Sequence, residues 1–126
     1  MAEMMTLLET LRDKLATVTG VQTCKIGMEA NITPEDYPIV RIVPSAVRQK
    51  NIAMRECDLI IYFGKPIHEF TAGLEALYSE LFTMESELLA AARTANSMMV
   101  QYEETVLDED RVDAYKLMAL RLTVAG

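Results

Sequence analysis

The sequence predicts an α+β fold, a mostly antiparallel sheet of about five strands covered on one face by an N-terminal helix and a long central helix. Apolar residues recur at helical spacing near the start and in the middle of the chain. Over the last thirty residues they alternate with polar ones, as on strands that bury one side. The 126 residues have the length of one domain and no linker or repeat divides them, so we expect residues 1–126 to form a single α+β domain.

The first half of the chain predicts a helix and three strands. An amphipathic helix should end at Gly20, because its apolar positions keep steps of three and four residues: Met4, Leu7, Leu8, Leu11, Leu15 and Val18. Residues 21–28 alternate as a short strand. The β-branched run at residues 39–43, closed by Pro44, predicts the second strand, and residues 56–63 predict the third.

Residues 45–55 form the basic segment of the chain, with Arg48, Lys50 and Arg55. Two structures fit it: a hairpin that continues both neighbouring strands, or a mobile loop that becomes ordered on contact with a partner. The long helix follows over residues 69–93, with residues 83–86 as the place for a bend or a split into two helices.

The last part of the chain predicts a long hairpin. Residues 97–108 and 111–125 both alternate, and the acidic run Asp108, Glu109 and Asp110 lies between them, where we expect the turn. Leu117 and Ala119 give the hairpin apolar content on its second side. One face of a half-covered sheet should therefore expose an apolar patch for another chain. Charged residues at these two positions are expected to spare folding and stop assembly.

Charge and hydropathy exclude several classes of partner. A formal net charge of −7 and a pI near 4.7 argue against direct binding of nucleic acid or of anionic lipid, which both require a basic face. The longest uninterrupted apolar run, residues 59–63, is too short to cross a bilayer. The start of the sequence lacks a basic segment followed by an apolar one, so we expect no signal peptide and a cytoplasmic chain.

Motifs for chemistry are missing from the sequence. His68 is the one histidine, which excludes a metal site with two histidines, and we interpret it as a surface or capping residue. No serine stands in a Gly-x-Ser-x-Gly turn, and the five glycines are too dispersed to cradle a phosphate. Cys24 and Cys57 lack the spacing of a zinc or redox pair. The acidic run does not have calcium-loop spacing. We therefore expect no enzyme and no cofactor.

Charge placement suggests how copies of the chain could associate. If the basic segment of one copy meets the acidic run of the next, the contact is head-to-tail and closes into a ring when the rotation permits. The residues predicted to form the interface between copies are Arg48, Lys50, Arg55, Asp108, Glu109, Asp110, Leu117 and Ala119.

The order and character of the segments resemble those of a known family. The segments are an N-terminal helix, residues 37–44 (YPIVRIVP), residues 57–64 (CDLIIYFG), a long helix and a closing pair of strands. The family is that of the small tail terminator or tail completion proteins of long-tailed bacteriophages and prophages, with the minor tail protein U type as the closest comparison. The resemblance covers nearly the whole chain but rests on pattern and size, so no binding residue is carried over from it.

The resemblance implies a non-enzymatic structural protein, made in the cytoplasm of the bacterial host and present in the virion tail. Such a protein forms a hexameric ring on the tail tube, halts tube polymerisation and presents a surface to the head connector. Its partners would be other copies of itself, the tail tube protein and the head connector protein. Two alternatives stay open: a head-tail connector or neck protein, and a small cytoplasmic ligand-binding or regulatory module with a pocket between the long helix and the sheet.

Overall fold

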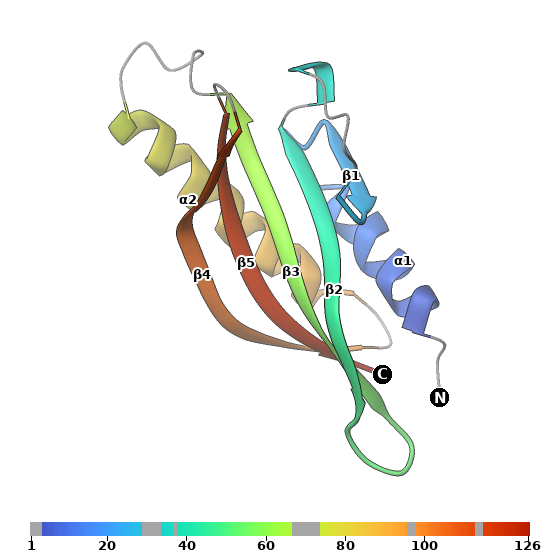
Figure 1. Ribbon diagram of the computed structural model, residues 1–126. Helices are drawn as coiled ribbons and strands as arrows, with labels where there is room; N and C mark the ends of the chain where they lie inside the picture. Colours follow the sequence, from blue (N-terminus) through green and yellow to red (C-terminus); the bar gives the residue numbers. More distant parts are fainter. Residues whose placement is uncertain (1–3, 29–33, 37, 67–73, 96–97, 113–114) are drawn as a thin grey trace.

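The computed structural model describes residues 4–28, 34–36, 38–66, 74–95, 98–112 and 115–126 (Figure 1). It has two helices packed on one five-stranded sheet, which confirms the predicted α+β class. The sheet order is β1-β2-β3-β5-β4, and the strands are β1 (Thr23–Ile26), β2 (Ile39–Gln49), β3 (Arg55–Pro66), β4 (Met99–Val112) and β5 (Tyr115–Ala125). All neighbours are antiparallel except β1 and β2, which are parallel, so the sheet is mixed but mostly antiparallel as expected.

Both helices, α1 (Met4–Leu15) and α2 (Leu74–Arg93), lie on the same face of the sheet (Figure 1). Their apolar sides and the inward side chains of the strands form one core, in which Leu77, Leu81 and Leu88 of α2 are fully buried with Ile61 and Phe63 of β3. The possible split at residues 83–86 does not occur, because α2 is continuous from residue 74 to residue 93. The predicted start of this helix, residues 69–73, lies outside the described residues, as does His68.

The basic segment is a hairpin, which decides between the two structures expected for it. Strand β2 continues past Pro44 to Gln49 and stays paired with β3, with a register shift between Pro44 and Ala46. Proline has no backbone N–H to donate to a neighbouring strand. It is tolerated here because β1 pairs with β2 only as far as Ile42, so no strand lies beside Pro44 on that edge of β2. The hairpin, which we call the arm (residues 46–56), extends past both helices, and the end of β5 pairs beside its base (Figure 1).

The first strand of the closing hairpin ends later than predicted, so the turn lies elsewhere. Strand β4 runs to Val112 and β5 begins at Tyr115, so the acidic run belongs to β4 and is not the turn; Asp110 pairs with Leu117. The prediction of an acidic turn was therefore wrong. Register shifts at residues 102–104 and 106–110 insert extra residues into β4, which moves the end of this strand along the sequence.

No helix in the described part of the chain is long and apolar enough to span a membrane.

Candidate functional site

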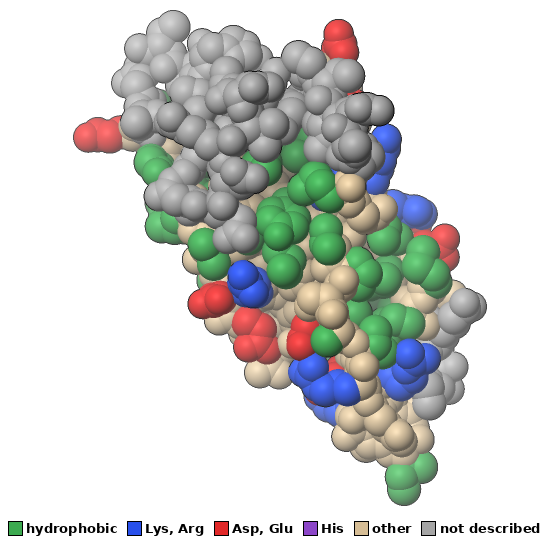
Figure 2. All heavy atoms as spheres, viewed as in Figure 1, with side chains coloured by type: hydrophobic (Ala, Val, Ile, Leu, Met, Phe, Trp, Pro, Cys, Tyr) green, Lys and Arg blue, Asp and Glu red, His purple; other side chains and the backbone are tan. Residues whose placement is uncertain are grey.

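The face of the sheet opposite the helices, which we call the open face, has both apolar and charged parts. Side chains alternate along β3, so Ile60 and Tyr62 lie on this face while Ile61 and Phe63 enter the core. Val43 pairs with Ile60 and, like Ile60 and Tyr62, is half-buried. Figure 2 shows hydrophobic side chains over the middle of the sheet and charged ones between them and the arm.

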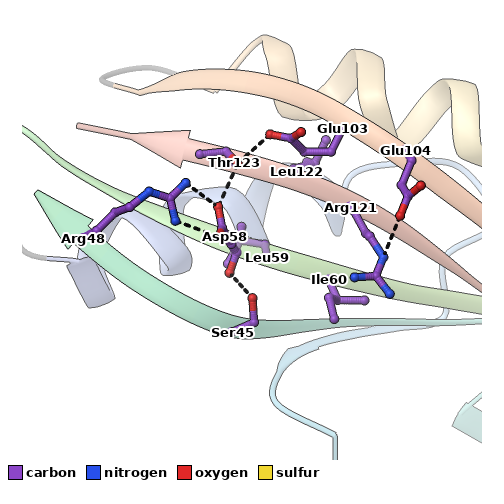
Figure 3. Close-up of a pocket in the computed structure, with 10 residues that line it drawn as sticks. All are labelled: Ser45, Arg48, Asp58, Leu59, Ile60, Glu103, Glu104, Arg121, Leu122 and Thr123. Atoms are coloured by element: carbon purple, nitrogen blue, oxygen red, sulfur yellow. Dashed lines mark hydrogen bonds and ion pairs between the residues drawn. The ribbon is translucent and has the colours of Figure 1, made fainter. Parts of the chain in front are cut away.

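A hollow of about 460 Å³ lies on the open face, near the base of the arm (Figure 3). Strands β2, β3, β5 and β4 all contribute to it, because these four strands are neighbours in the sheet. The lining residues are Ser45, Arg48, Asp58, Leu59, Ile60, Glu103, Glu104, Arg121, Leu122 and Thr123.

Arg48 is fixed by two carboxylates of the opposite strand. Its Nη1 and Nη2 donate to Asp58 Oδ2 and Oδ1 at 2.7 and 2.9 Å, and its Nε donates to Glu56 Oε1 at 2.6 Å. All five N–H donors of a guanidinium lie in one plane, so these contacts fix the side chain in both position and direction. The hydrogen bonds that Arg48 donates to Asp58, and then the one to Glu56, raise the pKa of Arg48 above its usual range.

Asp58 and Glu103 approach the same hydroxyl. Thr123 Oγ1 lies 3.0 Å from Asp58 Oδ1 and 2.9 Å from Glu103 Oε1 (Figure 3). A hydroxyl carries a single hydrogen, so it donates to one of two ionised carboxylates at a time. The hydrogen bonds from Arg48 lower the pKa of Asp58, partial burial opposes this, and the Thr123 hydroxyl adds to the lowering. Asp58 is therefore fully ionised at neutral pH.

The second arginine of the hollow is held less firmly. Arg121 Nε lies 3.4 Å from Glu104 Oε1, an ion pair without hydrogen-bond geometry. Two of the three carboxylates in the hollow thus have an arginine partner, Asp58 with Arg48 and Glu104 with Arg121. Among the described residues, Glu103 has no cation within ion-pair distance and contacts only the Thr123 hydroxyl.

The structure brings the three predicted basic residues together on the arm. Arg48 lies on β2, Lys50 follows it, and Arg55 begins β3. The charge of Arg48 is already paired within the chain, and Lys50 Nζ is 3.9 Å from Glu56 Oε2. Arg55 is exposed and makes no ion pair with the described residues, so it is the most available cation of the three.

The acidic run lies at the other end of the sheet. Asp110 pairs with Leu117, which pairs with Gly64, whereas the arm begins where Glu56 pairs with Ala125. The side chains of Asp108, Glu109 and Asp110 lie outside the described part of the structure. The segments predicted to carry the basic and the acidic groups are therefore at opposite ends of the sheet.

Leu117 and Ala119 are not exposed. Leu117 is 4% exposed and Ala119 is 0% exposed within a single chain. Both side chains point to the side of β5 opposite Met118 and Leu120, which enter the core between sheet and helices. These two residues therefore offer a neighbouring chain almost no surface, whereas the accessible apolar groups of the open face include Val43, Ile60, Tyr62 and Met99.

Sequence reasoning did not identify the carboxylates of the hollow. Asp58 lies on β3, whereas Glu103 and Glu104 lie on β4, at least 45 residues later in the sequence, and only the sheet order brings them close together. A signal did exist, since polar residues occupy the outward positions of β3 and β5 close to the arm, as at Glu56, Asp58 and Thr123.

The lining of the hollow offers paired charges and a hydroxyl to the polar groups of a partner. No group of three or more histidine, cysteine, aspartate or glutamate side chains in the described ranges could hold a metal ion. Cys24 is half-buried and Cys57 is buried, and both are free thiols. Comparison of the sequence with protein-family models and with curated proteins gave no match.

Proposed function

We propose that this chain is a non-enzymatic tail assembly protein of the tail terminator kind. It forms a ring of identical subunits that ends the tail tube and joins it to the head connector. The proposal combines the resemblance of residues 37–44 and 57–64 to that family with the shape and charge of the surface. Its partners are other copies of the chain, the tail tube protein and the head connector protein.

The arm is the observation that supports self-assembly most directly. Ile52, at its tip, is 94% exposed, and Val47 on its side is exposed as well. Burying a large aliphatic side chain stabilises by roughly 1.5–3 kcal/mol, and the isolated chain forgoes this at Ile52. A rigid hairpin, fixed by Arg48 and extended past the helices with an apolar tip, has the form of an element that inserts into another subunit.

The charges of the arm and of the open face also support a ring. Arg55 is exposed on the arm, whereas Glu103 lies in the hollow of the open face, so one copy presents different surfaces to its two neighbours. A contact between two different patches is head-to-tail, and repeated contacts of this kind close into a ring when the rotation permits.

Self-assembly is tested by replacing the exposed tip. The purified chain should form a species of several subunits in sedimentation velocity, and rings should be visible by negative-stain microscopy. Ile52→Asp should weaken the association at least about tenfold, because a charge replaces the side chain to be buried. Phe82→Asp, which changes an exposed apolar residue on α2, should leave the association near the wild-type level. A chain that is monomeric at every concentration contradicts the proposal.

Tail termination is tested with the tail tube protein encoded in the same genome. Tubes polymerised with the chain present should be shorter than tubes polymerised alone, and the chain should be found at tube ends by immunogold labelling. A neck protein of similar build would bind the connector and leave tube length unchanged. The alternative of a ligand module with a pocket between the long helix and the sheet is less favoured. Leu77, Leu81 and Leu88 are buried in the core there. The hollow beside α2, lined by Thr19, Gly20, Lys65, Glu80, Thr83, Met84 and Glu87, has about 230 Å³, half the volume of the hollow on the open face.

A further inference from the structure

We infer that the hollow on the open face is the receptor for the arm of a second copy of this chain, with Arg55 of one copy paired to Glu103 of the other. The inference rests on the proposed self-assembly and replaces the contact expected from the sequence, in which the arm met the acidic run. It names the partner surface and the charge pair that fixes the register.

The arm supplies one cation and one apolar side chain that the single chain leaves without partners among its described residues. Arg55 is exposed and has no ion pair there, whereas Arg48 is held by Asp58 and Glu56. Ile52 is close in sequence to Arg55, across the turn closed by the hydrogen bond from Lys50 N to Met54 O. The arm therefore carries an exposed apolar group and an exposed cation three residues apart in sequence.

The hollow supplies the complementary groups. Glu103 is its one carboxylate without an arginine partner among the described residues, and the Thr123 hydroxyl cannot serve Glu103 and Asp58 with the same hydrogen. Ile60 lies beside these carboxylates and is half-buried on the open face. A guanidinium reaching Glu103 would complete the charge pairing of the hollow, while Ile52 would cover Ile60.

Size and symmetry are consistent with this contact. About 460 Å³ is within the range of pockets that enclose a drug-sized ligand, so the hollow has room for two or three side chains. Arg48, in the arm, also lines the hollow, but Ile52 and Arg55 do not, so the tip of the arm and the hollow are different patches of the same chain. Every copy can therefore give its arm to one neighbour and receive the arm of the other, which is the arrangement that a closed ring requires.

A charge swap tests the pair. Arg55→Glu and Glu103→Arg should each weaken self-association at least about tenfold in sedimentation velocity, because each places like charges opposite one another. The double variant Arg55→Glu/Glu103→Arg should return to within about threefold of the wild type, since the pair is restored with its signs exchanged. Arg93→Glu and Glu9→Arg change the same charges at exposed positions on α2 and α1 and should have little effect.

Cross-linking under mild oxidation gives a second measurement, because a disulfide traps the contact covalently once the two chains meet. Arg55→Cys chains mixed with Glu103→Cys chains should form a disulfide-linked dimer on a non-reducing gel, and neither variant should do so alone. The native Cys24 and Cys57 remain in both, and their burial keeps them from competing.

The outcomes separate the docking from the function. The docking is overturned, and ring formation is not, if the single variants assemble like the wild type. It is also overturned if the double variant associates no more tightly than the single variants and the cysteine variants form no mixed dimer. A wild-type chain that is monomeric and leaves tube length unchanged overturns both.

Discussion

Arg48 and Asp58 face each other across the β2–β3 hairpin in a two-point ion pair, with N···O distances of 2.7 and 2.9 Å (Figure 3). The pair lies just past the register shift at Pro44 and Ala46, where the ladder between the two strands is irregular. Two parallel hydrogen bonds to one carboxylate define the direction of the Arg48 side chain as well as its distance from Asp58. The pair therefore links β2 and β3 where their backbone pairing is irregular, and so orients the arm.

The pair gives a pH dependence with a definite sign. Arg48 lowers the pKa of Asp58 in the folded chain, so its contribution to stability is complete above the pKa of an unfolded aspartate and is lost as the pH falls through the lower folded value. In Arg48→Gln the Asp58 pKa, followed by NMR of its carboxyl carbon, should rise towards the ordinary value. The acid side of the stability curve in urea should then be less steep. An unchanged Asp58 pKa would contradict the pairing.

Leu81 and Phe82 are neighbours on α2 with opposite environments. Leu81 is fully buried against the sheet, whereas Phe82 is 44% exposed. Leu81→Ala should lower the free energy of unfolding by about 2–5 kcal/mol, through lost apolar burial and the cavity left behind. Phe82→Ala should cost about 1 kcal/mol or less. Urea denaturation measures both, and equal losses would mean that α2 packs with a different face towards the sheet.

A substitution at Ala119 tests whether the open-face side of β5 is buried within the single chain. From the sequence, charged residues at 117 and 119 were expected to spare folding, but both side chains are buried in the single chain. Ala119→Asp should therefore destabilise the chain by at least about 3 kcal/mol, because an uncompensated carboxylate enters the interior. Met99→Asp, at a position 57% exposed on β4, should change stability by about 0.5 kcal/mol or less. A stable Ala119→Asp monomer would restore the original interface prediction.

Cys24 should react slowly with alkylating reagents in the folded chain. Burial raises its pKa to about 11, so roughly one thiol in a thousand is ionised at pH 8. Burial also raises the pKa of Cys57. Iodoacetamide at pH 8, followed by mass spectrometry, should label both cysteines quickly in urea and slowly without it. Rapid labelling of the folded chain would show that these thiols are accessible.

Periodicity in the sequence was sufficient for the helices and for the pairing of the last two strands, because local alternation reports which side of an element is buried. It failed at Pro44, which was expected to close a strand. The strand continues because β1 ends early and leaves that edge of β2 without a partner, a fact about neighbours that no local pattern contains. The acidic run was placed in a turn for a similar reason, since the extra residues in β4 are visible only in the register with β5.

The sequence by itself determined the α+β class, the two amphipathic helices, the inward-facing residues of β3 and β5 and the concentration of basic residues in residues 45–55. Tertiary structure decided which charges remain available. The register of β2 and β3 places Glu56 opposite Arg48 and Asp58 diagonal to it, so the charge of Arg48 is paired, whereas Arg55 and Glu103 are left without ion pairs among the described residues. Tertiary structure also buries Leu117 and Ala119, which alternation alone had placed on an exposed face. The physical reason is that burial and charge pairing depend on contacts between strands distant in sequence, whereas periodicity reports only contacts within one element.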